Sequence, residues 1–588
     1  MPQNPPNLVF ISWKVYNIFV EQMRINWIKI FFLLFFLAIS IRLFYWQAVR
    51  VEFLQAQAES QHFTNVKLAA IRGKIFFSDG TLLASSNPAY LLYGLPKVIA
   101  EDQKVSLSYT LAKIIAGSDP KEIDEIAKDI INKLSADLYW IRLENNISVE
   151  QKRAIEQLRV RGIGFEEGSV RFYPEGSTSA HLLGFVGKDA KGDDKGYFGL
   201  EGYYDGELRG LGGSVRHERD AVGLPILIGN FLETFAKDGK DLVLNIDRSV
   251  QFIVEQSLKN GLEKYGAKVA SAVVMDPETG NILALASFPN YDPLNYFEFP
   301  KEYYKNPIIS DQYEPGSTFK VFIMAAALNE EIITPETKCD QCSGPVSIGG
   351  FSLRTWNNKY YPQTSMKEVI VHSDNVGMVF VGRKLGQDKF HGYLEDFGFG
   401  NPTNVDLQDD FSPNIRPKSE WREIDLATAS FGQGIAVTGM QMVRAVGAIA
   451  NGGKLMEPHL VNKILDEEGS FEIKSKVIRE VIKASTAEQI KEMMIAAVSE
   501  GEAKFAKPKG FKIAGKTGTA QIPVAGHYDP NKTIASFVGF APADDPKFVM
   551  LVRYDQPSSS VYGSETAAPT FFEIAKELFT YFKIAPSE

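Results

Sequence analysis

Residues 269–286 read VASAVVMDPETGNILALA. Two apolar, β-rich runs, Val269 to Met275 and Ile282 to Ala286, flank the turn sequence Asp276-Pro277-Glu278-Thr279-Gly280-Asn281. Because aspartate, proline, glycine and asparagine favour turns, this stretch predicts a β-hairpin. Residues 250–264, just before it, place valine, isoleucine and leucine on one face of a helix. A hairpin beside an amphipathic helix indicates a sheet covered by helices.

The rest of the C-terminal half extends this pattern. An alanine-rich apolar helix is expected at Phe319 to Leu328, after Pro315-Gly316, and an amphipathic helix at Phe571 to Tyr581. Three more strand-like runs lie at residues 512–521, 533–540 and 548–554. Together with the hairpin they predict an α+β domain over residues 241–588, with a mainly antiparallel five-stranded sheet flanked by helices.

Composition describes the whole chain. Its 588 residues suggest roughly three to four domains at about 150 residues each. Hydrophobic residues make up 45% and charged residues 23%, as in globular proteins, and the net charge of −9 argues against nucleic-acid binding. A polar boundary, Lys237 to Asp241, precedes the C-terminal domain. Before it we expect a mixed domain over residues 50–240, with a charged helical stretch from Lys121 to Arg153 and glycine-rich loops and short strands over residues 163–213.

An apolar segment lies near the N-terminus. Residues 27–46 are long enough to span a bilayer as a helix, and their two charges, Lys29 and Arg42, lie near the ends. We expect an uncleaved transmembrane anchor, with residues 1–26 as a cytoplasmic tail. The alternative is a cleaved signal peptide, but the nearest small-residue site, Ala56-Gln57-Ala58, lies far beyond the apolar run. Basic residues flank both ends about equally, so they do not set the orientation.

The first of three short motifs is Ser317-Thr318-Phe319-Lys320, at the start of the apolar helix. Residues three apart lie on one helical face, so the Lys320 amine can lie beside the Ser317 hydroxyl. Serine becomes a nucleophile when a base takes its proton, and lysine is such a base only if burial or nearby positive charge lowers its pKa. Alone, this motif is also explained by a surface pair on a helix.

The second motif is Ser373-Asp374-Asn375, expected on a loop between two helices. Ser373 can relay protons, and the Asn375 amide can hold a substrate carbonyl and the Lys320 amine. By itself this is a common turn sequence.

The third motif is Lys516-Thr517-Gly518-Thr519, within a predicted strand. Lys516 supplies positive charge, and the hydroxyls of Thr517 and Thr519 can bind a carboxylate. Gly518 lacks a side chain, which would let a substrate backbone lie against the strand edge. The N–H groups of Thr519 and Ser317 are candidates for an oxyanion hole.

The three motifs occur in order, with 56 and 143 residues between their first residues. This is the Ser-x-x-Lys, Ser-x-Asn and Lys-Thr-Gly set of penicillin-binding proteins and serine β-lactamases. The chain resembles class B penicillin-binding proteins beyond this set, and YEPGSTFK and SFGQGI are most similar to the division type. The matching segments are Arg72-Gly73-Lys74-Ile75, Arg171-Phe172-Tyr173-Pro174, Gly199-Leu200-Glu201, YEPGSTFK (313–320), SFGQGIAVT (430–438) and AGKTGTAQ (514–521).

The resemblance implies an elongated, dimerisation-like pedestal domain over residues 50–240 and a transpeptidase domain over residues 241–588. It implies a single-pass protein of the inner (cytoplasmic) membrane, with an extracytoplasmic catalytic domain that cross-links peptidoglycan stem peptides in septal synthesis. Expected partners are these stem peptides, β-lactams as inhibitors, a membrane-embedded glycan polymerase and other division proteins. No cofactor, metal or nucleic acid is expected.

The resemblance also assigns roles to the motif residues. Ser317 would attack a D-Ala–D-Ala bond with Lys320 as base, and Ser373 would pass the proton to the leaving group. Asn375 would orient the peptide, and the third motif would hold its carboxylate through Lys516, Thr517 and Thr519.

Several other functions share part of this pattern. A D,D-carboxypeptidase uses the same acylation with water as acceptor, and an elongation-type transpeptidase differs only in its cellular role. A β-lactamase is usually compact and secreted, and a non-catalytic β-lactam sensor or scaffold would not need Ser317.

The chain has two cysteines, Cys339 and Cys342. We expect them to form a short disulfide outside the cytoplasm, with two free thiols as the alternative.

Overall fold

The computed structural model describes residues 9–55, 63–68, 70–190, 192–218, 231–524 and 527–587. The chain forms two compact units, one of residues 1–69 and 212–236 and the other of residues 70–211 and 237–588. The small-residue site Ala56-Gln57-Ala58 lies outside the described residues.

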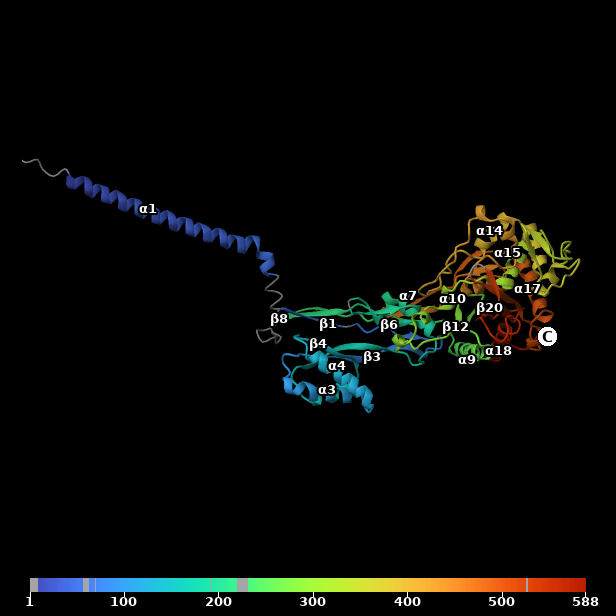
Figure 1. Ribbon diagram of the computed structural model, residues 1–588, viewed down its shortest axis with the longest axis horizontal. Coiled ribbons are helices and arrows are strands. Elements are labelled where there is room, and N and C mark those ends of the chain that lie inside the picture. The colour runs from blue at the N-terminus through green and yellow to red at the C-terminus, as the bar shows by residue number, and fades with distance from the viewer. Residues whose placement is uncertain are drawn as a thin grey trace, which may run out of the picture. The chain divides into compact units, whose positions relative to one another are not determined.

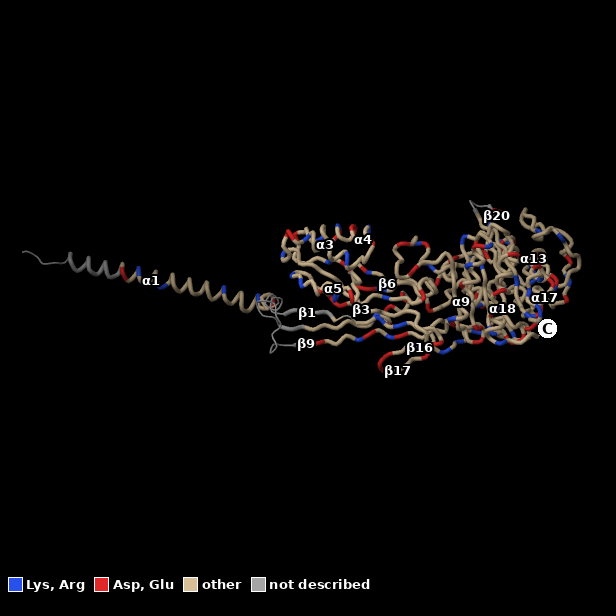
Figure 2. The backbone as a smooth tube through the Cα atoms, turned by 90° about the horizontal axis from the view of Figure 1, so that it is seen from below, with Lys and Arg blue, Asp and Glu red and all other residues tan. Residues whose placement is uncertain are grey.

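The first unit contains the long helix α1 (Val9–Phe44), continued by a π-helical turn (Tyr45–Val49). The most apolar window within residues 20–49 has a mean hydropathy of 2.2, and no part of that window is buried inside the protein. Figures 1 and 2 show α1 as a continuous helix with few charged residues along its second half. The predicted span 27–46 lies within α1 and the first two residues of the π-helical turn, and such an exposed apolar helix fits a single-pass membrane anchor.

The remainder of the first unit is a three-stranded antiparallel sheet in the order β1-β8-β9. Its strands are β1 (Phe63–Leu68), β8 (Gly213–Glu218) and β9 (Phe231–Thr234).

The second unit contains a seven-stranded sheet in the order β17-β16-β10-β2-β3-β4, with β5 also paired to β3. Strand β10 begins at Asp241, directly after the predicted domain boundary, and it pairs parallel with β2 and antiparallel with β16. The sheet therefore takes strands from both sides of residue 240, and the boundary there stays a prediction. The strands are β2 (Ile75–Phe76), β3 (Leu82–Gly94), β4 (Ile141–Ile147), β5 (Ile163–Phe172), β10 (Asp241–Leu244), β16 (Val461–Asp466) and β17 (Gly469–Glu472).

Three helices pack with β3, β4 and β5 around a separate apolar core that includes Leu92, Leu111 and Leu143. They are α3 (Glu101–Ala116), α4 (Pro120–Leu134) and α5 (Val149–Gln157). The prediction of one helical stretch from Lys121 to Arg153 is wrong, because β4 interrupts it. Leu143 and Ile147 are buried against the sheet, and the Ser148–Gln151 capping box starts a new helix.

A buried ion cluster joins the segments of this region that resemble class B proteins. Glu201 accepts from Arg72 at 2.7 Å and from Arg171 at 2.6 Å, and Arg72 also pairs with Asp205 at 2.7 Å. Glu201 itself is fully buried. Short elements surround the cluster: α6 (Ala180–Leu183), β6 (Phe185–Lys188), β7 (Asp194–Tyr197), α7 (Gly199–Tyr203) and α8 (Asp205–Leu208).

The sequence of residues 269–286 forms the predicted hairpin, and the predicted five-stranded sheet is confirmed. All its strands are antiparallel, in the order β12-β11-β21-β20-β19, so β19 is an edge strand. The strands are β11 (Val269–Met275), β12 (Ile282–Phe288), β19 (Ala514–Val524), β20 (His527–Ala541) and β21 (Phe548–Asp555).

Alternation along these strands places apolar side chains on both faces of the sheet. Ala272 and Val552 pack in the core with α9 (Arg248–Tyr265) and α18 (Ala567–Tyr581), whereas Val273 and Leu551 belong to the core on the opposite face. That second core contains α11 (Lys320–Asn329), α13 (Asn375–Leu385), α16 (Gly439–Ala450) and α17 (Ala484–Ser499). The apolar runs are explained by burial on both faces.

Further elements complete the second unit. They are α10 (Pro307–Ser310), β13 (Val346–Ile348), β14 (Phe351–Leu353), α12 (Met366–Val371), α14 (Gln387–Asp396), α15 (Glu423–Ala429), β15 (Lys454–Met456) and β18 (Val477–Glu480).

Candidate active site

The first motif forms a tight turn before α11. Residues 316–319 make a 3₁₀ turn, and Thr318 donates a hydrogen bond from Oγ1 to Pro315 O at 2.7 Å. The Gly316 N–H binds Gly432 O at 3.0 Å, so the 430–438 segment supports this turn. Ser317 is partly exposed, whereas its neighbours from Pro315 to Lys320 are buried. The serine is therefore the accessible residue of the turn.

Lys320 is fully buried at the start of α11. Its Nζ donates to Ser373 O at 2.6 Å, to Asn375 Oδ1 at 2.8 Å and to Ser373 Oγ at 3.3 Å. Among the described residues, these three oxygens are its hydrogen-bond partners, and Ser317 is not one of them. The first two motifs thus meet through the lysine amine, one turn along the helix from Ser317.

The second motif links α12 to α13, as predicted for a loop between two helices. The backbone of this link is strained. Ser373 has a φ of +54°, in the left-handed region that non-glycine residues seldom adopt. Asp374 caps α13 by accepting from the N–H groups of Val376 and Gly377. Asn375 donates from Nδ2 to Arg354 O at 3.0 Å while its Oδ1 accepts from Lys320. The amide of Asn375 is fixed on both sides.

The third motif reaches the same point from β19. Lys516 Nζ donates to Ser373 Oγ at 3.0 Å and to Thr517 Oγ1 at 3.2 Å. Ser373 Oγ therefore lies between the two amines of Lys320 and Lys516. The structure brings Lys320, Ser373, Asn375 and Lys516 into one hydrogen-bonded cluster, although Ser373 lies 53 residues from Lys320 and 143 residues from Lys516 in the sequence.

Gly518 also has a packing role that was not predicted. A Cβ at this position would lie 2.5 Å from Ser536 Oγ, 2.8 Å from Thr318 Cγ2 and 3.1 Å from Pro315 O. The space for a side chain is therefore occupied by β20 and by the turn that carries Ser317, and the approach of a substrate backbone to the edge of β19 stays a prediction. Gly518 lets the serine turn pack against the strand.

Thr519 lies next to the serine turn. A Cβ at Gly316 would lie 3.0 Å from Thr519 O, so this carbonyl faces the turn. In an antiparallel strand the N–H and C=O of one residue point to the same side, so the Thr519 N–H also points away from β20. Thr519 Oγ1 accepts from the Gly563 N–H at 3.0 Å and keeps its own proton to donate.

Burial governs the charges of the site. It lowers the pKa of Lys516 to about 8, and the charge of Glu502 opposes this shift. Burial, and then the charge of Lys516, hold the pKa of Lys320 well below its ordinary value, whereas Asp374 and Glu502 act in the opposite direction. Burial also raises the pKa of Asp374. A lysine with a lowered pKa can serve as a base, as the sequence argument requires.

Two contributors to the site were missed by the sequence argument. Asp374 belongs to the second motif, and its only other sequence signal is that of a helix-capping residue before an apolar run. Glu502 lies in a turn after α17, and no local sequence signal distinguishes it from the other glutamates.

The predicted disulfide is confirmed: Cys339 and Cys342 are bonded to each other, and both are fully buried. The Cys339 N–H binds Thr364 O at 2.9 Å, just before the Ser365 cap of α12. This hydrogen bond therefore holds the disulfide-bonded loop to the segment that leads to Ser373.

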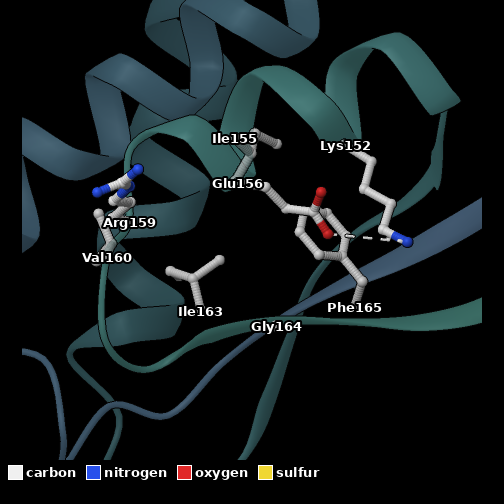
Figure 3. A pocket seen from close by; sticks show the side chains of 8 residues that line it. All are labelled: Lys152, Ile155, Glu156, Arg159, Val160, Ile163, Gly164 and Phe165. Carbon is white, nitrogen blue, oxygen red and sulfur yellow. Dashed lines mark ion pairs between the residues drawn. The ribbon is translucent and has the colours of Figure 1, made fainter.

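A separate surface hollow of about 360 Å³ lies between α5 and β5. Figure 3 shows its apolar floor, with Ile155 and Phe165, and the ion pair between Lys152 and Glu156, whose Nζ and Oε1 lie 3.8 Å apart. None of its lining residues belongs to the three motifs, so it is not part of the candidate active site.

The arrangement of motifs is matched by known protein families. Residues 270–576 match the family described as the penicillin binding protein transpeptidase domain, and residues 67–244 match the penicillin-binding protein dimerisation domain. The chain belongs to the class B penicillin-binding proteins, and it is an enzyme with their transpeptidase domain.

Individual relatives extend over nearly the whole chain. The chain is 34% identical to stage V sporulation protein D of Bacillus subtilis, over 97% of this chain and 88% of that protein. It is 28% identical to the probable peptidoglycan D,D-transpeptidase PenA of Neisseria meningitidis, over 96% and 94%. The crystal structure of penicillin binding protein 3 from Mycobacterium tuberculosis complexed with aztreonam is similar with a TM-score of 0.68 and 26% identity, covering 89% of this chain and 98% of that one.

Proposed function

We propose that this protein is a serine-type peptidoglycan D,D-transpeptidase that works through an acyl-enzyme on Ser317. The observation that carries the proposal is the buried amine of Lys320, held by Ser373 and Asn375 one helical turn from an accessible serine. The names of its relatives give the substrate class, peptidoglycan. Burial holds the pKa of Lys320 well below its ordinary value, which favours the uncharged amine that a general base requires.

In the first half-reaction, Ser317 Oγ bonds to the carbonyl carbon of the penultimate D-Ala, and its proton moves to Lys320 Nζ. The peptide C–N bond then breaks, and the leaving D-Ala amine takes a proton through Ser373 Oγ. The N–H groups of Ser317 and Thr519 stabilise the oxyanion. In the second half-reaction an amine of a neighbouring stem forms the new amide, the ester C–O bond breaks, and Ser317 regains its proton.

Substrate binding falls to the third motif and Asn375. The charged Lys516, with the hydroxyls of Thr517 and Thr519, binds the terminal carboxylate, because a buried cation strongly favours an anion. Asn375 orients the peptide through its amide. β-Lactams mimic the D-Ala–D-Ala end and would acylate Ser317 in the same way.

The purified protein, supplied with glycan strands that carry pentapeptide stems, is expected to form cross-linked dimers and release one D-Ala per cross-link. Mass spectrometry of the digested product measures both quantities. A large excess of free D-Ala without dimers would instead identify a D,D-carboxypeptidase, and no D-Ala release at all would leave a sensor or scaffold.

We also propose a septal role. Its support is the sequence of the 313–320 and 430–435 segments, which resemble the division type. Depletion of the protein is expected to give filamentous cells, because septal cross-linking stops while elongation continues; light microscopy measures the cell length. Rounded cells after depletion would identify an elongation enzyme.

The proposed topology places the catalytic domain outside the inner (cytoplasmic) membrane, with the predicted tail, residues 1–26, in the cytoplasm. Two observations support it: the apolar helix α1 and the disulfide Cys339–Cys342, since disulfides persist outside the reducing cytoplasm. A membrane-embedded glycan polymerase and other division proteins are the proposed partners. A membrane-impermeant penicillin would then reach Ser317 from outside intact spheroplasts.

A further inference from the structure

Glu502 lies where three elements of the active site converge. It follows helix α17, which packs against α11, α12 and β19. These elements begin with Lys320, lead into Ser373 and carry Lys516, respectively. A residue that closely follows α17 can therefore reach the motif cluster if its side chain points inward.

The backbone at this point approaches the second motif closely. A Cβ at Gly501 would lie 2.2 Å from Ala497 O and 3.0 Å from Val371 O, the last residue of α12. The neighbouring Glu502 side chain is directed inward: its Oε1 is buried and, within the described part of the chain, has no hydrogen-bond partner. A buried carboxylate oxygen without a donor is costly unless a cation lies nearby.

Two buried lysine amines lie in the motif cluster, and a charge on either of them supplies that compensation. Lys320 is fully buried and Lys516 is 3% exposed. The charged groups that act on Lys320 are Lys516, Asp374 and Glu502, whereas Glu502 is the charged group that acts on Lys516. Asp374 in turn is influenced by Lys320 and His372. Glu502 thus acts on both lysines, and it is the carboxylate that acts on Lys516, whereas Asp374 acts on Lys320.

We propose that Glu502 is a positioning residue whose buried carboxylate keeps the Lys516 ammonium charged for substrate binding while Lys320 gives up its proton. This inference rests on the proposed function, in which the two lysines have these different roles. Without Glu502, the two buried amines would keep Asp374 as their remaining counter-ion, and the Lys516 amine would lose its charge at a lower pH than in the native protein.

The test is the pH dependence of acylation in Glu502→Gln, measured with full-length detergent-solubilised protein and a fluorescent penicillin between about pH 6 and pH 10. The second-order rate constant reports the free enzyme, and the two coupled amines titrate as a pair. Removing a negative charge destabilises the protonated amines, so both pKa values fall. The alkaline limb of the profile is therefore expected to move to lower pH by about one unit.

Two further variants separate charge from structure. Glu502→Asp keeps the charge and is expected to restore most of the wild-type profile. Glu500→Gln is the matched control, because Glu500 lies two residues away with a side chain 62% exposed, paired with Lys367 at 3.9 Å; its profile is expected to match the wild type. A merely structural role for Glu502 would lower the rate at every pH without moving the limb.

Each outcome decides one point. An alkaline limb that stays in place or moves to higher pH in Glu502→Gln overturns the inference. The proposed function still stands in that case if penicillin labels the wild type and does not label a variant without Ser317. Labelling that persists without Ser317 would overturn the proposed function itself.

Discussion

Ser317→Ala is expected to abolish covalent labelling of the protein by a membrane-impermeant fluorescent penicillin in intact spheroplasts. Ser317 carries the accessible hydroxyl of the turn before α11. It lies one helical turn from Lys320, whose amine is buried. Alanine removes the oxygen that forms the ester, and the surrounding groups cannot replace it. The labelled fraction, measured by in-gel fluorescence, should fall by about 10³-fold or more.

The matched control is Ser347→Ala. Ser347 is an exposed serine of β13 outside the motif cluster, so this variant should label like the wild type. Stoichiometric label on Ser317→Ala would assign the nucleophile to another residue. Labelling of the wild type only after membrane disruption would reverse the proposed topology.

Lys320→Arg is expected to lose acylation by about 10²- to 10⁴-fold, the usual contribution of a general base. A guanidinium stays protonated at any working pH, so it cannot accept the Ser317 proton even though it keeps a cation in place. Burial gives the native lysine the opposite property, because it lowers the pKa of Lys320 well below the ordinary value. Stopped-flow or gel-based acylation rates measure the loss.

Arginine is larger than lysine, and the site is fully buried, so a second variant is needed. Lys320→Met has a similar length and no base, and it is expected to show the same loss; thermal unfolding reports whether each variant is folded. Lys454→Arg, an exposed exchange on β15, should leave the rate unchanged. Acylation of both Lys320 variants at near wild-type rates would exclude this lysine as the base.

Local sequence patterns predicted the catalytic sheet well because its strands are apolar and bounded by strong turn signals. The hairpin at Asp276 to Asn281 and the five antiparallel strands are both present. The pattern failed between Lys121 and Arg153, where short apolar spacings fit a helix as well as a strand. Pairing of β10 with β2 and β16 joins residues far apart in the chain, and local periodicity carries no information about such partners.

The motif residues were predicted to lie together, and Lys320, Ser373, Asn375 and Lys516 do so. Their roles stay predictions. What the sequence argument lacked were the groups that tune these residues through space. The effect of Glu502 on the lysines depends on its burial and on its distance from them. Neither quantity can be derived from the neighbours of Glu502 in the chain. The reason for Gly518 was also hidden, since the turn that fills its side-chain space comes from Pro315 and Thr318.

The seven-stranded sheet has a mechanical consequence. Strand β10 hydrogen-bonds on one side to β2, which continues into the β3–β5 region, and on the other to β16, which follows α16 of the catalytic half. Backbone ladders thus run without a break from the β3–β5 region to β16. A hinge between the two halves of this unit would have to break the hydrogen bonds of β10.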